Sequence, residues 1–360
     1  MQHMLTIQQQ IEEIEEVLRK TPHHKATNGF IGAMRAKIAR LKDKMEWSPS
    51  AGSGSSSGGG YSVKKQGDAT VVLIGPPSAG KSTLINLITN TESKVAAYAF
   101  TTVSVIPGML KYKEGYIQIL DVPGLIEGAS IGKGRGKEVL SVVRGADLLI
   151  FMTDPKRLNF FDKLMTELEI AGIRVNKKRP EIRIEKKISG GLSVRSNFKQ
   201  DFDNQTIINV ANEFGIKNGS ITLKQKMTTD ELVDSFSQRI VYKSAIFVVN
   251  KADLDLGQRY EDLIYISAEK NSGIDELKEI IWQKLELVTV YLLEKSEKPN
   301  KQNSIIMKKG DSLNDVCQKI GSEFAQNTNL AKIWGEGAKF DGQEIPLSAK
   351  VMDGMIVRFI

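Results

Sequence analysis

The sequence contains few of the residues on which many catalytic and metal sites depend. Cysteine occurs once, at Cys317, and histidine three times, at His3, His23 and His24. A single cysteine cannot form an internal disulfide, and we expect Cys317 to be a small buried residue in a reducing cytoplasm. The three histidines lie close together near the amino terminus, which argues against a histidine-rich metal site and against histidine-based catalysis.

Long apolar runs are also missing. No stretch reaches the length that crosses a membrane, and the amino terminus shows no secretion-signal pattern, so we expect no membrane association. The 360 residues leave room for two or three domains. The formal net charge of +7 favours an anionic partner such as RNA, although a modest excess of lysine is also common on a plain solvated surface.

A glycine-rich loop follows the first apolar run, Val71–Ile74, and precedes a helical pattern over 83–88. The loop GPPSAGKS fits G-x-x-x-x-G-K-[ST], and strand, loop and helix together predict a phosphate site. Lys81 would reach the β- and γ-phosphates, and the Ser82 hydroxyl would bind Mg²⁺. The predicted phosphate-binding residues are Gly75, Pro76, Pro77, Ser78, Ala79, Gly80, Lys81, Ser82 and Thr83.

Further residues suited to the γ-phosphate and to Mg²⁺ follow in order. After a second apolar strand comes the run Asp121, Val122, Pro123 and Gly124. Asp121 would hold Mg²⁺ through water, and the Gly124 N–H would meet the γ-phosphate. Between the two motifs, Phe100, Thr101 and Thr102 offer a second hydroxyl ligand for Mg²⁺; we choose Thr102, with Thr101 as the alternative. The predicted catalytic residues are Lys81, Thr102 and Gly124.

The remaining motifs select the base. A third apolar strand, Ile246–Val249, ends in N-K-x-D, which supplies Asn250, Lys251 and Asp253. The carboxylate can accept from both the ring N–H and the exocyclic amine of guanine, whereas adenine would leave it unpaired. A last strand leads to a loop that can touch the base, formed by Ser267, Ala268 and Glu269. Five motifs in this order, each behind an apolar strand, predict an α/β P-loop fold that binds GTP or GDP and hydrolyses GTP.

Leu125 follows Gly124 at the place where many GTPases carry a glutamine that orients water. An apolar side chain cannot polarise water, so we expect slow hydrolysis, or hydrolysis assisted by a partner, a monovalent cation such as K⁺, or another residue. The alternative is that Leu125 only packs and that catalysis relies on the backbone.

Other segments surround this domain. Apolar residues at spacings of three and four predict a helical hairpin at the amino terminus, whose second helix carries a basic face suited to RNA, to an acidic partner, or simply to solvent. A strand, a helix and a terminal strand near the carboxyl terminus predict a β-grasp domain. The predicted domains are residues 1–47 (hairpin), 48–63 (Gly/Ser-rich linker), 64–155 with 243–290 (GTPase), 156–242 (inserted α/β domain) and 302–360 (β-grasp).

Within the insertion, two alternating segments, 181–187 and 192–195, predict strands joined as a hairpin through the turn at 189–191. Helices are predicted over 204–214 and 229–240, the second capped by Thr229 or Thr228, with a strand over 220–223 between them. The GTPase domain is expected to close with a helix from residue 274 to about residue 287.

Several long strings are more specific than the nucleotide motifs. They are HKAT at 24–27, KVAAYAFTT at 94–102, DVPGLIEGA at 121–129, GKGRG at 132–136, GIRVN at 172–176 and IWG at 333–335. Because of these strings, the chain resembles the developmentally regulated GTP-binding proteins of the Obg–HflX superfamily, and the resemblance extends over nearly its whole length.

The resemblance implies a cytoplasmic GTPase that acts on ribosomes or in translation with slow intrinsic turnover. It also implies an insertion similar to the second domain of ribosomal protein S5 and a carboxyl-terminal TGS domain. Eukaryotic members of that family work with a stabilising partner protein, and for this chain both possibilities stay open. Relatives without the glutamine include potassium-stimulated enzymes, but their loops often carry Asn where this chain has Ser78. The alternatives are a GTP-gated scaffold for ribosomes or RNA with negligible hydrolysis, an ATPase, which Asp253 argues against, and a DNA-binding role for the basic hairpin.

Overall fold

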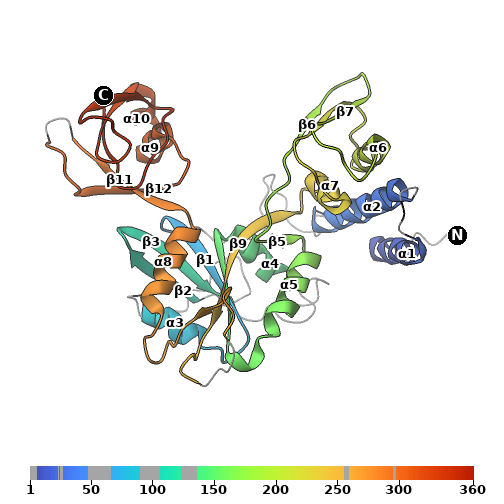
Figure 1. The fold of residues 1–360 in the computed structure, drawn as a ribbon, viewed down its shortest axis with the longest axis horizontal. Helices are drawn as coiled ribbons and strands as arrows, with labels where there is room; N and C mark the ends of the chain where they lie inside the picture. Colours follow the sequence, from blue (N-terminus) through green and yellow to red (C-terminus); the bar gives the residue numbers. More distant parts are fainter. Residues whose placement is uncertain are drawn as a thin grey trace, which may run out of the picture. The chain divides into compact units, whose positions relative to one another are not determined.

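The computed structural model describes residues 6–22, 24, 27–47, 66–89, 106–122, 136–254, 259–294 and 297–360. The chain divides into two compact units (Figure 1). The first combines Met1–Gly58 with Gly172–Tyr242, and the second combines Gly59–Ala171 with Lys243–Ile360. The predicted Gly/Ser-rich linker, residues 48–63, lies wholly outside the described residues, and the predicted domain boundaries remain predictions.

The second unit contains a mainly parallel sheet in the strand order β10-β9-β4-β1-β3-β2. Strands β1 and β4 are buried at every residue, as expected of central parallel strands covered on both faces. Only β2 and β3 pair antiparallel along this order. The strands are β1 (Ala69–Ile74), β2 (Ile106–Tyr112), β3 (Gly115–Asp121), β4 (Leu148–Thr153), β9 (Val241–Val249) and β10 (Ile264–Tyr265).

Helices cover both faces of this sheet. Helices α3 (Lys81–Ile88) and α8 (Ile274–Lys284) share one apolar cluster with the strands. On the other face, Phe161 of α5 (Phe160–Ile170) meets Phe247 edge to face, with ring centroids 5.2 Å apart. Helix α4 (Gly136–Gly145) precedes β4. Because the strands run parallel, their carboxyl ends lie along one edge, and the predicted nucleotide motifs follow those ends.

The carboxyl-terminal part of this unit forms a second sheet, in the order β12-β11-β15-β13-β14. Its elements are β11 (Leu287–Leu292), β12 (Asn303–Lys308), α9 (Leu313–Ile320), α10 (Ser322–Asn327), β13 (Leu330–Trp334), β14 (Gln343–Pro346) and β15 (Ile356–Phe359). Strand β11 was not predicted, because its apolar residues continue the run of α8, which ends earlier than expected, at Lys284. Cys317 on α9 is fully buried, as predicted, and burial raises the pKa of its thiol.

Two ion pairs tie this carboxyl-terminal part to the parallel sheet. Lys319 Nζ lies 3.0 Å from Asp68 Oδ1 and also donates to the Ile306 carbonyl, while Lys308 Nζ lies 3.1 Å from Asp147 Oδ1. Ile306 of β12 is buried in the same cluster as α3 and α8. The two parts therefore share a packed core as well as exposed charges.

The other unit combines the amino-terminal helices with the inserted residues. Helices α1 (Ile7–Lys20) and α2 (Asn28–Trp47) form the predicted helical pair, packing through Ile11, Ile14 and Leu41. Ala36 of α2 is fully buried in the cluster of the inserted elements, and Arg35 Nη1 lies 2.6 Å from Asp230 Oδ1. The inserted elements are β5 (Ile173–Val175), β6 (Ile182–Lys186), β7 (Leu192–Ser196), α6 (Asn204–Glu213), β8 (Gly219–Leu223) and α7 (Thr229–Phe236).

The predicted hairpin of β6 and β7 is wrong. The three strands lie in the order β6-β8-β7, so β8 separates the other two. Strand β8 pairs antiparallel with β6 and parallel with β7. It takes the centre because three of its five residues, Gly219, Ile221 and Leu223, are buried, whereas β6 and β7 alternate between half-buried and exposed positions. Helix α6 then carries the chain from β7 back to a parallel β8.

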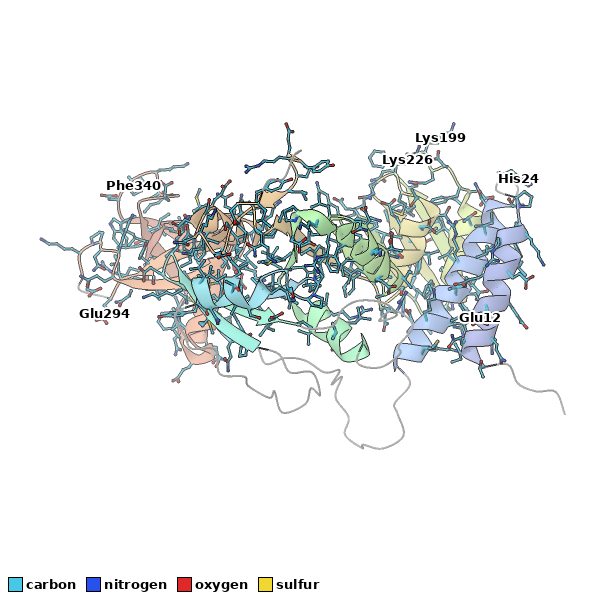
Figure 2. The ribbon with its side chains drawn as sticks, turned by 90° about the horizontal axis from the view of Figure 1, so that it is seen from below. Glu12, His24, Lys199, Lys226, Glu294 and Phe340 are labelled. Atoms are coloured by element: carbon cyan, nitrogen blue, oxygen red, sulfur yellow. The ribbon has the colours of Figure 1, made fainter. Side chains whose placement is uncertain are left out.

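Helix α7 also ends earlier than predicted, at Phe236 rather than residue 240. Its start follows the predicted chemistry, because the Thr228 hydroxyl accepts from the Glu231 N–H in a capping box. None of the described helices is long and apolar enough to cross a membrane. Exposed side chains include Phe340 on the carboxyl-terminal part, and Lys199 and Lys226 on the insertion (Figure 2).

Candidate nucleotide-binding site

The glycine loop connects the end of β1 to the start of α3. Gly80 caps the helix at a φ of 91°, in the left-handed region. A Cβ on Gly75 would lie 2.1 Å from the Met152 carbonyl oxygen, and one on Gly80 would lie 2.2 Å from Asn250 Nδ2. Both positions therefore need glycine. The first N–H groups of α3 have no partner within the helix and, with the helix dipole, suit an anion.

The Lys81 ammonium lies over this loop. Lys81 Nζ donates to the Gly75 carbonyl at 3.0 Å and to the Pro76 carbonyl at 3.2 Å. These contacts hold the positive charge beside the backbone groups that would surround a phosphate. The ammonium can therefore exchange carbonyl contacts for charged phosphate oxygens with little rearrangement.

Asp121 reaches the same loop from the end of β3, which pairs with β1 so that Leu73 lies opposite Asp121. The Ser82 hydroxyl donates to Asp121 Oδ2 at 3.4 Å. Asp121 Oδ1 is buried and has no hydrogen-bond partner among the described residues. Burial raises the pKa of Asp121, and the Lys81 charge and the Ser82 hydrogen bond oppose that shift only in part.

Asn250 connects the phosphate loop to the loop after β10. Its buried amide donates from Nδ2 to the Ala79 carbonyl at 2.9 Å, and its Oδ1 accepts from the Ala268 N–H at 2.9 Å. Lys251 Nζ donates to the Ser78 carbonyl at 2.9 Å from the next position. The two predicted halves of the site, for phosphate and for base, are thus joined by one side chain.

Asp253 is held in place by the residues that follow β10. The Ser267 hydroxyl donates to Asp253 Oδ1 at 2.7 Å, and Lys270 Nζ lies 3.7 Å from Oδ2. The hydrogen bond from Ser267, with a smaller contribution from Lys270, lowers the pKa of Asp253. The side chain is therefore an ionised acceptor at neutral pH.

Comparison with known proteins agrees with this geometry. Residues 70–187 match a family described as 50S ribosome-binding GTPase, residues 189–287 match the C-terminal region of that domain, and residues 288–360 match a TGS domain. The chain is 40% identical to an uncharacterised GTP-binding protein of Methanocaldococcus jannaschii, over 99% of this chain and 93% of that one. It is 36% identical to developmentally-regulated GTP-binding protein 2 of Homo sapiens, over 95% and 96% of the two chains.

The chain belongs to the developmentally regulated GTP-binding protein family. The predicted resemblance is thereby confirmed, as is the P-loop GTPase fold with a carboxyl-terminal TGS domain. This protein is accordingly a GTP-binding GTPase of the Obg type.

One part of the site in this family member was not predicted. Arg157 Nη1 donates to the Pro77 carbonyl at 2.9 Å, and its Nε donates to Asp154 Oδ2 at 3.0 Å. Burial of Asp154 opposes ionisation, but Arg157 lowers the pKa of this carboxyl overall. The pair braces the phosphate loop from the end of β4. The sequence did contain a signal for this brace. Asp154 and Arg157 follow an apolar strand, at the sheet edge where the other motifs lie.

Other predicted site residues stand apart from these contacts. Val122 is buried and its N–H donates to the Leu73 carbonyl, while Thr83 and Glu269 are exposed. Six residues lie outside the described part of the chain: Phe100, Thr101, Thr102, Pro123, Gly124 and Leu125. Among the described residues no group of three or more histidine, cysteine or acidic side chains could hold a metal. Of the three predicted Mg²⁺ ligands, Ser82 and Asp121 are described and lie in contact, and Thr102 lies outside the described residues.

Replacing Asn250 tests the connection between the two loops. We expect Asn250→Ala to speed GDP release by about tenfold or more, because it leaves a buried carbonyl and a buried N–H unpaired. Stopped-flow release of a fluorescent GDP analogue measures the rate. Glu276→Ala, at an exposed position of α8, is the matched control. An unchanged release rate in Asn250→Ala would show that the amide does not organise the site.

Proposed function

We propose that this protein hydrolyses GTP to GDP and phosphate with Mg²⁺, slowly on its own, and that it acts on ribosomes in the cytoplasm. The observation that carries the proposal is the meeting of Lys81, Ser82 and Asp121 at the amino end of α3. A cation, a hydroxyl and a buried carboxylate are the groups that a nucleotide triphosphate with its metal ion requires.

The proposed metal ligands fit Mg²⁺, which prefers oxygen and keeps several waters. Ser82 and Thr102 would supply hydroxyl oxygens, and Asp121 would hold the ion through water. Asp121 Oδ1, which has no hydrogen-bond partner in the described part of the chain, supports this role, because a buried carboxylate oxygen needs a donor or a cation nearby. When bound, Mg²⁺ would offset charge on the β- and γ-phosphates.

The chain's own groups would then act on the phosphates and on water. Lys81 and the loop N–H groups would stabilise negative charge on the phosphates, and the Gly124 N–H would meet the γ-phosphate. Water would attack the γ-phosphorus as the bond to the β-phosphate oxygen breaks. Leu125 cannot orient this water, so a ribosomal group, a partner protein or K⁺ would have to complete the site.

Base selection is assigned to the N-K-x-D residues and the loop after β10. Asp253 would accept from both donors on the guanine edge, while Asn250 and the Ala268 N–H would keep the two loops in register. Adenine offers no matching pair of donors, which makes an ATPase the weaker reading.

The ribosome is proposed from the description of the matching GTPase family and from the positive net charge of the chain. A second function is a GTP-gated scaffold that docks on ribosomes or RNA and hardly hydrolyses GTP. Leu125 is the observation in its favour, because it occupies the place of the water-orienting side chain.

Removing the Asp121 charge should have two opposite effects. The pKa of Asp121 is raised in the folded protein, so the ionised carboxylate destabilises the fold as the pH rises through that pKa. Asp121→Asn should therefore raise the melting temperature of the nucleotide-free protein.

The same variant should need about tenfold more Mg²⁺ for tight GTP binding. Titrations of Mg²⁺ with a fluorescent GTP analogue measure this. Asp275→Asn, an exposed change on α8, is the control, and an unchanged Mg²⁺ requirement would remove Asp121 from the metal site.

Turnover by the intact chain separates the enzyme from the scaffold. We expect a basal rate near 10⁻⁴ s⁻¹, on the order of an unassisted small GTPase, and strong stimulation by ribosomes. Phosphate release in potassium and in sodium, with and without ribosomes, measures it, and Lys81→Ala controls for contaminating activity. Stimulation by potassium alone would indicate that K⁺, and not a ribosomal or partner group, completes the site. A flat, slow rate in every condition would contradict the enzyme and favour the scaffold.

A further inference from the structure

Strand β6 of the inserted module has an open edge. Among the described residues it pairs with β8 on one side and with no strand on the other. The pairing places Glu181 and Lys187 toward β8, since the Lys224 N–H donates to the Glu181 carbonyl and the Lys187 N–H donates to the Asn218 carbonyl. In an antiparallel pair the intervening even-numbered residues direct their peptide groups the other way.

The outward-facing groups therefore belong to Ile182, Ile184 and Lys186. The Ile182 N–H is satisfied by the Pro180 carbonyl at 3.1 Å. The N–H groups of Ile184 and Lys186, and the carbonyls of these residues and of Ile182, meet no backbone partner elsewhere in the described part of the chain. A row of alternating donors and acceptors of this kind is what an added strand requires.

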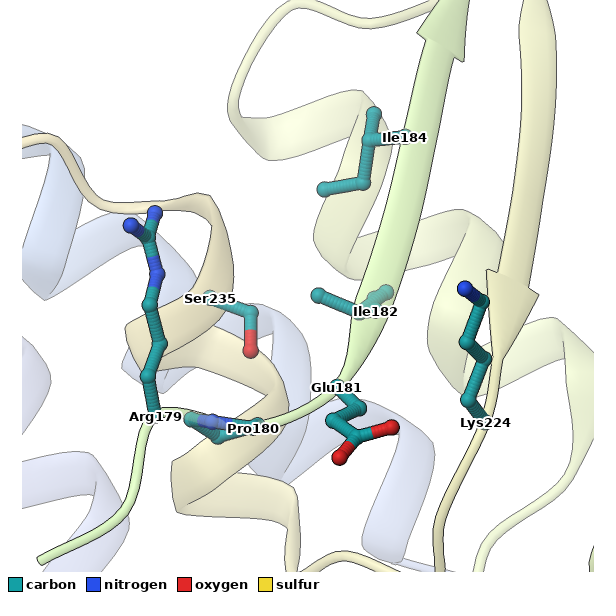
Figure 3. Close-up of a pocket in the computed structure, with 7 residues that line it drawn as sticks. All are labelled: Arg179, Pro180, Glu181, Ile182, Ile184, Lys224 and Ser235. Carbon is teal, nitrogen blue, oxygen red and sulfur yellow. The ribbon is translucent and has the colours of Figure 1, made fainter. Parts of the chain in front are cut away.

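A hollow of about 520 Å³ runs beside this edge, between β6 and α7 (Figure 3). The Ile182 and Ile184 side chains line it from the strand, and Ser235 lines it from the helix. Both isoleucines are half-buried and border the apolar core of the module. An extended chain on β6 would place every second side chain over this hollow, where an apolar side chain could be buried.

The surroundings of the hollow are positively charged. Arg179 and Lys224 line it, together with the single carboxylate of Glu181, and neither cation forms an ion pair with a described residue. Residues 177–187, with the sequence KKRPEIRIEKK, include six basic and two acidic side chains. One of the two acids, Glu185, accepts from Ser220 and is paired with Arg183. This imbalance favours an acidic occupant.

We propose that the β6 edge binds an extended acidic peptide segment of a partner protein, added to the sheet as a strand next to β6. An apolar residue of the segment occupies the hollow between β6 and α7, and a flanking Asp or Glu residue meets Arg179. A nucleic acid could satisfy the charges, but it would use neither the free peptide groups nor the apolar hollow. This docking site goes beyond the proposed function, because it requires neither GTP hydrolysis nor ribosome binding.

Selection from a phage-displayed library of random peptides on the full-length protein tests the proposal. We expect enriched peptides to carry an apolar residue flanked by acidic residues. Lys186→Pro should weaken a fluorescein-labelled enriched peptide about tenfold, because it removes an outward N–H that β8 does not use. Lys186→Thr, which loses the same charge but keeps the N–H, is the matched control and should bind nearly as well as the unchanged protein.

Two further arms identify the mode of binding. Arg179→Glu should weaken the acidic peptide, whereas Lys199→Glu, which does not line the hollow, should leave its affinity unchanged. N-methylation of alternate peptide residues should abolish binding, and this arm tests the same hydrogen bonds if Lys186→Pro unfolds the module. All variants should keep GDP binding. Failure to enrich acidic peptides, equal effects of the proline and threonine variants, or binding of an oligouridine RNA in place of peptides would overturn the proposal.

Discussion

The site depends on one buried amide. Asn250 joins the Ala79 carbonyl of the phosphate loop to the Ala268 N–H of the loop after β10, so the two loops cannot move independently without leaving buried polar groups unpaired. Gly80 is part of the same constraint, because a Cβ there would collide with the Asn250 amide. Other groups extend the bracing: Lys251 contacts Ser78, and Arg157 contacts Pro77.

The fold supplies that amide with a fixed position. Asn250 follows β9, which lies beside β4 in the parallel sheet, and β4 lies beside β1, which leads into the phosphate loop. The carboxyl-terminal TGS domain is tied to the same sheet through Lys319 with Asp68 and through the shared packing of Ile306. The nucleotide loops and the TGS domain are therefore attached to the same sheet, the loops at its strand ends and the TGS domain through the shared packed core.

The sequence predicted what depends on local chemistry. The glycine loop, the N-K-x-D strand end and the Thr228 cap follow from short patterns whose geometry is set within a few residues. The sequence did not predict the pairing of strands that lie far apart in the chain. Strand β8 separates β6 from β7 because a central strand is chosen by burial in the whole module, which a turn at 189–191 does not reveal. Strand β11 was hidden in an apolar run continuous with α8, and the Arg157–Asp154 brace appears only when β4 and the loop meet.

The most direct test of the account is an exchange of base specificity. Asp253→Asn replaces an acceptor by an amide that can donate to the extra carbonyl of xanthine, and Ser267 can still hold the side chain. Competition between GDP and xanthosine diphosphate measures the exchange, with the unchanged protein as the reference. We predict that GDP affinity falls by about 100-fold or more and that the xanthine nucleotide becomes the preferred ligand. A variant that still prefers GDP would contradict the assignment of Asp253, in the loop after β9, to guanine recognition.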